Sequence, residues 1–202
     1  MIRYKISILL LIGFAVTHDC FSQNVIVNAF MENKKAKPGN DTIYYDFSRN
    51  LTWEDFKGTP DNNQLEAAVT ASGFAFDAQT SFDGVNMDFN IGVYTFFTKN
   101  DSWKKPQINS DYQLLHEQHH FDITRLGAQK LVAELAKAHF TKQNYNKLIT
   151  SIFDKAYKEM ESIQSQYDIE TNHSLNKEKQ LEWNDKIASD IQKLKESVVI
   201  RN

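Results

Sequence analysis

The chain has 202 residues, of which 24% are charged, and a formal net charge of −3 at pH 7. This mildly acidic balance, with only short basic pieces, argues against nucleic acid or an anionic membrane as the main partner. The length fits one domain whose core is large enough to fold without disulfide bonds.

The first 22 residues have the pattern of a secretory signal peptide. Arg3 and Lys5 precede an apolar run of about 11 residues, and cleavage after Ser22 leaves Gln23 as the first residue. The run is shorter than the roughly 20 residues that a membrane-spanning helix needs, so no stable membrane anchor is expected after cleavage. We therefore expect an exported protein, located in the periplasm or secreted into the medium.

The only cysteine, Cys20, lies within this leader. Asp19 directly before it is a poor match to a lipid-attachment site, so Cys20 is expected to leave with the signal peptide. The mature chain then has no thiol, which excludes disulfides and thiolate metal ligands together. Any metal ion must be bound by His, Asp or Glu side chains.

The mature chain divides into a β-like region followed by helices. Residues 23–40 end in a polar stretch and are expected to form a linker, which leaves a single domain at 41–202. At its start, TIYYDF, AAVTASGFAFDA and VNMDFNIGVYTFFT are rich in β-branched and aromatic residues and partly alternate apolar with polar ones, which predicts strands. Strands first and helices later indicate an α+β domain with a mainly antiparallel sheet.

Three helices are predicted in the second half of the chain. Apolar residues at helical spacing and the absence of proline predict a largely buried helix over about 110–138. A cleaner amphipathic pattern from Tyr145 to Ile163 predicts the second helix, and the last helix is expected at about 177–195. The polar stretch YDIETNHS, residues 167–174, is interpreted as a loop between them.

The sequence HEQHH on the first of these helices matches the motif H-E-x-x-H. His116 and His120 are four residues apart, so both imidazoles can reach one ion from the same helix face. Glu117 lies where it can take a proton from a zinc-bound water, making the nucleophile of a hydrolase, and pass it to the leaving group. A polar core without metal is the alternative, but two histidines on a buried helix need partners that are hard to supply otherwise.

Two polar neighbours of the motif have other predicted roles. His119 points less directly at the ion than His116 and His120 do, and is expected in the core or behind the ligands. Asp122 either fixes the tautomer of a neighbouring histidine, as carboxylates near metal-bound imidazoles do, or is simply solvated.

A catalytic zinc ion takes three protein ligands and leaves a position open, so a further ligand is needed. A histidine six residues after His120 would be the metzincin arrangement, but that residue is Leu126, which excludes this subclass. Glu159 and Glu161 of the second helix are expected on its solvent-facing side.

Helix geometry points to the loop after the second helix instead. If the first two helices are antiparallel and the chain reverses at 139–142, residues whose numbers sum to about 280 lie side by side. His116 is then level with residue 164, and the loop at 167–174 lies beside the motif. We expect His173 as the third ligand, with Asp168 or Glu170 as alternatives. Tyr167 either donates a hydrogen bond to the oxyanion formed during attack or closes the core.

Four segments resemble a family of exported bacterial proteins that is long described as a domain of unknown function and predicted to be secreted zinc-dependent proteases. They are LTWEDFKG (51–58), SWKK (102–105), LLHEQHHFDIT (114–124) and YDIETNHS (167–174). The family usually has a small residue in place of His119 and a glycine in place of Ser174. The resemblance implies a zincin-like fold and metallopeptidase chemistry.

The leading hypothesis is therefore an exported zinc (Zn²⁺) peptidase acting on a peptide or protein substrate, in which a strand near GVYTFFT (92–98) pairs with an extended peptide. One alternative is a non-catalytic exported module that binds a metal or a partner. Glu117 favours the enzyme, because a purely structural metal site does not need it. Another alternative is an amide or ester hydrolase other than a peptidase, which would use the same residues.

Overall fold

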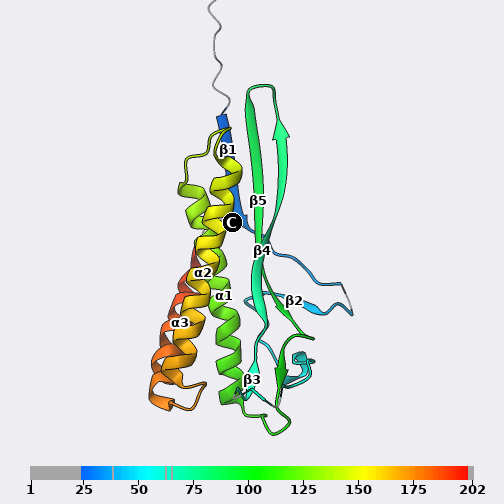
Figure 1. The fold of residues 1–202 in the computed structure, drawn as a ribbon, viewed down its shortest axis with the longest axis vertical. Helices are drawn as coiled ribbons and strands as arrows, with labels where there is room; N and C mark the ends of the chain where they lie inside the picture. The colour runs from blue at the N-terminus through cyan, green and yellow to red at the C-terminus, as the bar shows by residue number, and fades with distance from the viewer. Residues whose placement is uncertain (1–23, 38, 62, 65, 200–202) are drawn as a thin grey trace, which may run out of the picture.

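The computed structural model describes residues 24–199 except 38, 62 and 65, so the expected signal peptide lies outside the described residues. The main sheet is built around β5 (Asn86–Thr98). On one edge β5 pairs with β4 (Ser72–Phe82) in antiparallel fashion, and on the other it pairs with β1 (Asn24–Met31) in parallel and β2 (Thr42–Tyr44) in antiparallel. The sheet is thus mainly antiparallel, as expected, with one parallel strand. Figure 1 shows β4 and β5 as a long hairpin beside the helices.

β1 occupies a segment that was expected to be a polar linker, and for residues 24–31 that expectation was wrong. The strand alternates in burial along its whole length. Its half-buried residues pack against the main core: Val25, Val27, Ala29 and Met31. The polar stretch NKKAKPGND, on which the linker prediction rested, begins only after the strand, and the alternation before it is the pattern of a half-buried strand.

Three short elements lie outside the main sheet. The 3-10 helix η1 (Trp53–Asp55) follows β2, and β3 (Ala68–Val69) pairs antiparallel with β6 (Trp103–Lys104). Thr70, directly after β3, donates a hydrogen bond to Glu117, so the segment just before β4 lies against the first long helix.

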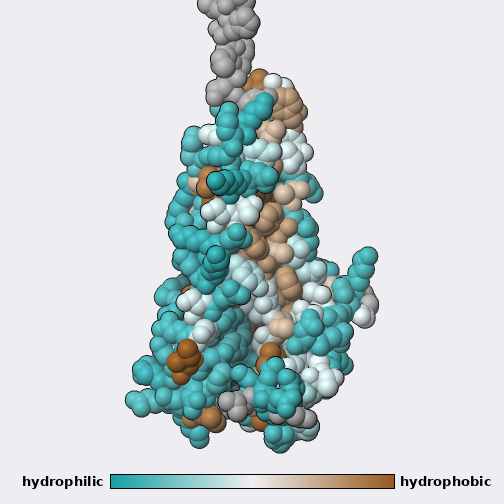
Figure 2. Space-filling model, viewed as in Figure 1, coloured by the Kyte–Doolittle hydropathy of each residue, from teal (hydrophilic) through white to brown (hydrophobic). Residues whose placement is uncertain are grey.

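Three helices follow the strands: α1 (Asp111–Lys137), α2 (Tyr145–Thr171) and α3 (Lys177–Val199). α1 packs on β1, β4 and β5, and α2 and α3 pack on α1 and on each other. Figure 1 shows the resulting layers, with the sheet on one side and the helices on the other. In the space-filling view of Figure 2, the surface over the helices is largely hydrophilic, and more hydrophobic side chains are visible along the strands beside them. The α+β architecture, a sheet followed by three helices, agrees with the prediction from the sequence.

α1 forms the centre of the molecule and most of one side of its core. Ser110 caps its N-terminus by accepting a hydrogen bond from the backbone N–H of Gln113. Apolar residues of α1 join those of the strands and of α2 and α3 in one cluster, which includes Ile91, Val93, Ile123, Leu131, Leu135, Met160, Tyr167 and Ile187. Within the described part of the chain, no helix has the length and apolar character that crossing a membrane requires.

α2 continues beyond the point where a loop was predicted. The loop was expected from residue 167, but the helix extends to Thr171, and Tyr167 and Thr171 are fully buried. No glycine or proline interrupts this part of the chain, so burial of these two side chains outweighs the polar residues between them. The helix ends where Asn172, His173 and Ser174 all adopt left-handed backbone angles.

Candidate metal centre

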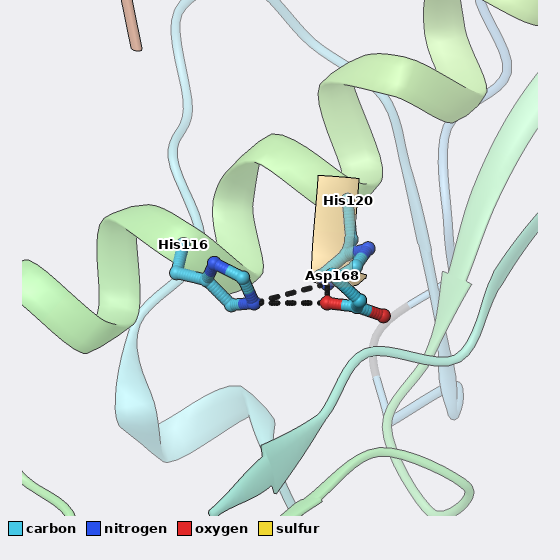
Figure 3. Close-up of side chains that lie close together, drawn as sticks. All are labelled: His116, His120 and Asp168. Carbon is cyan, nitrogen blue, oxygen red and sulfur yellow. Dashed lines mark hydrogen bonds and ion pairs between the residues drawn. The ribbon is translucent and has the colours of Figure 1, made fainter. Parts of the chain in front are cut away.

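Three side chains from two helices converge on one point beside α1 (Figure 3). The Nε2 atoms of His116 and His120 are 3.3 Å apart. Asp168, near the end of α2, places Oδ1 at 3.2 Å from Nε2 of His116 and 3.1 Å from Nε2 of His120. One ligand atom from each of these three residues lies within 4.8 Å of the others, so the triad can hold a metal ion.

The separations fit a tetrahedral ion. Bonds of about 2.0–2.1 Å at tetrahedral angles separate neighbouring ligand atoms by about 3.4 Å, close to the separations among His116, His120 and Asp168. Two imidazole nitrogens and one carboxylate oxygen are also a donor set that zinc accepts in catalytic sites. The residues present therefore fit a divalent ion with an open coordination position.

Two glutamine side chains set the orientation of the histidine rings. Oε1 of Gln180 on α3 lies 2.9 Å from Nδ1 of His116, and Oε1 of Gln164 on α2 lies 2.5 Å from Nδ1 of His120. Both amide nitrogens are occupied elsewhere, donating to Tyr167 and to the backbone oxygen of His120 respectively. The amide oxygens must therefore accept from Nδ1–H, which leaves the Nε2 lone pairs of both rings facing the centre.

The same convergence shifts two pKa values strongly. Burial alone would lower the pKa of His120, but the hydrogen bond and negative charge of Asp168 raise it to about 9. Burial would raise the pKa of Asp168, but hydrogen bonds from His116 and His120 hold it well below the usual range. Without a cation the centre therefore retains a proton, and a cation that binds there must displace it.

Glu117 lies next to the triad without being part of it. Its side chain is buried, and Oε2 accepts a hydrogen bond of 2.7 Å from the hydroxyl of Thr70, just after β3. It lines the same cavity as His116 and His120. The three candidate ligands are thus His116, His120 and Asp168, and the Glu117 carboxylate lies beside them without joining the triad.

The cavity in front of these residues has a volume of about 290 Å³. One wall is the segment from Glu66 to Thr70, which includes β3, and the opposite wall is the C-terminal half of α2. The strand near GVYTFFT (92–98) was expected to flank the helix and to pair with an extended peptide; it does pack on α1, but its edges are occupied. That strand is part of β5, whose two edges are already paired with β4 and with β1 and β2, and whose Val93 and Phe97 are buried.

The structure brings Asp168, not His173, to the two histidines. His173 lines the cavity, but its side chain is 43% exposed and its Nδ1 lies 3.6 Å from Oδ1 of Asp168. Because α2 continues through residue 168, Asp168 lies one turn after Gln164 on the side that faces α1. Asp168, one of the alternatives left open by the sequence, thus has the place in the candidate triad that was expected for His173.

The remaining candidates from this segment face elsewhere. Glu170, the other alternative, accepts a hydrogen bond of 2.8 Å from the indole of Trp183 on α3. Tyr167 is fully buried, stacks on the ring of His116 with centroids 4.6 Å apart, and accepts a hydrogen bond from Gln180. It does not line the cavity, so the oxyanion role considered for Tyr167 is corrected to a core role in which it supports the His116 ring.

His119 and Asp122 form a separate buried network on another side of α1. Nδ1 of His119 lies 3.0 Å from Oδ2 of Asp122, and Oδ1 of Asp122 accepts hydrogen bonds from Tyr45 and Gln118. His119 is thus a core residue, as expected. Asp122 is buried rather than solvated, and the tautomer it fixes is that of His119, not of a candidate ligand.

Gln164, Gln180 and Thr70 support the centre but were not identified from the sequence. Gln164 has a local signal, because it lies four residues before Asp168 and therefore on the same face of α2. Gln180 and Thr70 have none, since their roles depend on how α3 and β3 pack against α1.

Residues 103–174 match the model of a family described as "Bacterial protein of unknown function (DUF922)". The match covers just over a third of the chain, from β6 to the turn after α2, and includes the triad and Glu117. Neither the curated proteins nor the solved structures include a match to this chain. The similarity thus coincides with the candidate centre and leaves its chemistry to be inferred from the geometry.

Proposed function

We propose that the protein is an exported zinc-dependent peptidase of the zincin type. The proposal rests on the convergence of His116, His120 and Asp168 next to a buried carboxylate, Glu117, at the wall of an open cavity. A purely structural zinc site uses four protein ligands and is closed. Three candidate ligands beside a cavity support a catalytic site instead.

Each residue has a defined task in this proposal. The bound zinc ion would lower the pKa of a water molecule towards neutrality and polarise the substrate carbonyl. Glu117 accepts the proton of the attacking water and donates it to the leaving amine. Because the Thr70 hydroxyl donates to Oε2 of Glu117, Oε1 is the oxygen left to carry the proton. Gln164, Gln180 and Tyr167 keep both imidazoles aligned.

The backbone of β3 supports an extended peptide as the substrate. The N–H of Lys105 donates to the oxygen of Ala67, and Val69 is the next residue that faces β6 in this antiparallel ladder. Alternate residues of such a ladder face opposite ways, so the backbone groups of Ala68 point away from β6. No other described strand pairs with β3, which leaves this edge for a peptide strand along the cavity.

The test measures metal content and cleavage in parallel. Zinc per chain is determined by mass spectrometry for the wild type, Asp168→Ala and Glu117→Gln, and each protein is incubated with a peptide library. We expect one zinc ion in the wild type and in Glu117→Gln, and little in Asp168→Ala. Cleavage should fall by about 10²–10⁴-fold in Glu117→Gln, the usual contribution of a general base.

His119→Gln is the matched control, because it removes a buried histidine of the same helix that lies outside the triad. It should retain both zinc and cleavage. Zinc binding without cleavage that depends on Glu117 would favour the non-catalytic module. Cleavage of esters or small amides, but not of peptides, would favour the other hydrolase. A wild-type protein that binds no divalent ion would overturn the metal centre itself.

A further inference from the structure

We propose that the cleft selects cationic peptides, with Lys or Arg on both sides of the reacting bond, and that Glu66 and Glu161 determine this preference. The inference rests on the proposed peptidase function and names the substrate class of that site. It follows from the charges that line the cleft, from their position on either side of the triad, and from the open edge of β3.

The described lining of the cavity is strongly acidic. It includes four carboxylates, those of Glu66, Glu117, Glu161 and Asp168, and no Lys or Arg. Glu117 and Asp168 are engaged by Thr70 and the histidines. Glu66 and Glu161 form no ion pair with any residue in the described part of the chain. These two carboxylates are therefore available to a cationic ligand.

Glu66 lies towards the N-terminal end of α1. The segment after β3 runs along α1 in the same direction as the helix, because Thr70 bonds Glu117 and Ser72 bonds Thr124. At Ala67, three residues before Thr70, the extended chain has moved back by about 10 Å, and Glu66 directly precedes the bend there. This places Glu66 beyond the triad on the side where the helix begins.

Glu161 lies on the other side of the triad. α2 is antiparallel to α1 at the centre, since Asp168 contacts His116 and Gln164 bonds both His120 and Thr124. Glu161 precedes Asp168 by seven residues, or about 10 Å along the helix. It therefore flanks the cleft towards the C-terminal end of α1.

An extended peptide bound along β3 would pass both glutamates. The distances from the triad to Glu66 and to Glu161 add up to about 20 Å, the length of roughly six residues of extended chain. The surface between them includes the small and apolar side chains of Ala67, Ala68 and Val69, and Met160 and Tyr157 continue it beyond Glu161. This surface accepts the peptide backbone, while the charged positions that distinguish one peptide from another lie at the ends of the cleft.

The effect of each glutamate should be moderate and dependent on salt. Glu161 is exposed and Glu66 half-buried, and ion pairs at such positions contribute little each, corresponding to about a two- to fivefold change in affinity. Two of them together should give about a tenfold preference for cationic over neutral peptides. The preference should decline as ionic strength rises.

The experiment measures binding without turnover. Zinc-loaded Glu117→Gln protein is titrated with fluorescent octapeptides whose termini are blocked and which carry Lys, Gln or Glu two to four positions from the central bond on each side. Anisotropy gives the affinity of each peptide at low and high salt. The Lys peptide should bind about tenfold more tightly than the Gln peptide, and the Glu peptide most weakly.

Charge reversal assigns the effect to the two residues. Glu66→Lys and Glu161→Lys are each added to the Glu117→Gln protein, singly and together. Each should weaken binding of the Lys peptide relative to the Glu peptide, and the two together should make the Glu peptide the tighter ligand. Glu196→Lys is the matched control, since it makes the same exchange at an exposed position near the end of α3, and should leave the order unchanged. An equal response of all three variants would indicate only a change in net charge and would overturn the proposal.

The two proposals fail in different ways. Wild-type cleavage of peptides with no preference for charge would overturn the cationic specificity and leave the peptidase intact. Tight binding of the Lys peptide that depends on Glu66 and Glu161, with no cleavage by the wild type, would support the specificity of the cleft and overturn the peptidase.

Discussion

Two sides of α1 carry the same kinds of side chain and use them differently. On one side His116 and His120 direct their Nε2 atoms towards Asp168, at the wall of a cavity. On the other side His119 bonds Asp122, whose carboxylate also accepts from Tyr45 and Gln118. Nε2 of His119 is buried without a partner in the described structure, but His119 belongs to no group of three or more potential metal ligands among the described residues.

The difference shows what distinguishes a candidate metal site from a polar core. A buried histidine is common to both sides, and so is a carboxylate within hydrogen-bond distance. What differs is the direction of the second ring nitrogen. On the cavity side, two glutamines accept hydrogen bonds from the Nδ1–H groups of both histidines, so both Nε2 lone pairs are directed to the same point. On the core side, the carboxylate of Asp122 bonds Nδ1 of a single histidine, His119.

The largest effect is expected from removing a candidate metal ligand on the cavity side of α1. His116→Ala or His120→Ala removes one of only three candidate ligands, so stoichiometric binding of zinc should be lost. Metal content after dialysis, measured by mass spectrometry, checks this. His119→Ala changes the same residue type on the other side of the helix and should retain one ion per chain. Loss of metal in His119→Ala alone would mean that the two sides have been assigned the wrong way round.

Removing the carboxylate of the buried His119–Asp122 network should lower the stability of the fold and leave metal binding intact. Asp122→Ala leaves the buried donors of Tyr45, Gln118 and His119 without an acceptor, at a cost of about 3 kcal/mol in the free energy of unfolding. Urea denaturation of the metal-free protein measures the change. Asp122→Asn keeps an acceptor and should lose less. A stable Asp122→Ala protein that no longer binds zinc would contradict the separation of the two networks.

Lowering the pH should weaken the binding of zinc to the triad on the cavity side of α1. The pKa of His120 in the folded protein, about 9, exceeds the ordinary value of about 6.5, so its protonated form stabilises the metal-free fold. That stabilisation is complete below about pH 6.5 and is lost as the pH rises through 9. Because zinc must displace this proton, its apparent affinity should fall about tenfold per pH unit from pH 9 down to pH 6.5.

Chelator competition at several pH values measures this slope. Calorimetry in buffers of different ionisation enthalpy counts the protons released on binding. His119→Ala should show the same slope as the wild type. An affinity that does not change between pH 6.5 and 8.5 would show that the centre holds no such proton.

The smallest effect is expected from changing a glutamine whose amide orients a histidine of the triad. Gln180→Leu removes the acceptor for Nδ1 of His116 and should weaken zinc binding by about 10–100-fold, as is usual for groups that hold metal-binding histidines. Gln180→Glu restores an acceptor and should recover much of the affinity. Chelator competition gives both values, and unchanged affinity in Gln180→Leu would show that the ring of His116 is held by Tyr167 alone.

Local patterns were sufficient to predict the central part of this molecule. The spacing of His116 and His120 placed both on one helix face, and the limits of α1 differ from the prediction by one residue at each end. The antiparallel arrangement of α1 and α2 was also predicted from the short connection between them. Each of these features depends on residues close together in the sequence or on regular helix geometry.

Features that depend on long-range packing were not predicted. The extension of α2 through Asp168 follows from burial of Tyr167 and Thr171 against the rest of the core, while the local sequence is typical of a polar loop. The position of Gln180 behind His116 requires α3 to return along α1. β1 was missed for a different reason, because its alternating residues carry a local strand signal but the prediction rested on the polar stretch that follows them.

The neutrality of Gln164 and Gln180 has a consequence for the strength of the centre as a Lewis acid. A divalent ion held by two uncharged imidazoles and the Asp168 carboxylate retains one net positive charge. Carboxylates in place of the two amides would bring further negative charge close to the ion and weaken its pull on a carbonyl oxygen or a water molecule. By orienting the rings with amides, the protein aligns its candidate ligands and preserves the electrophilicity of the ion they would hold.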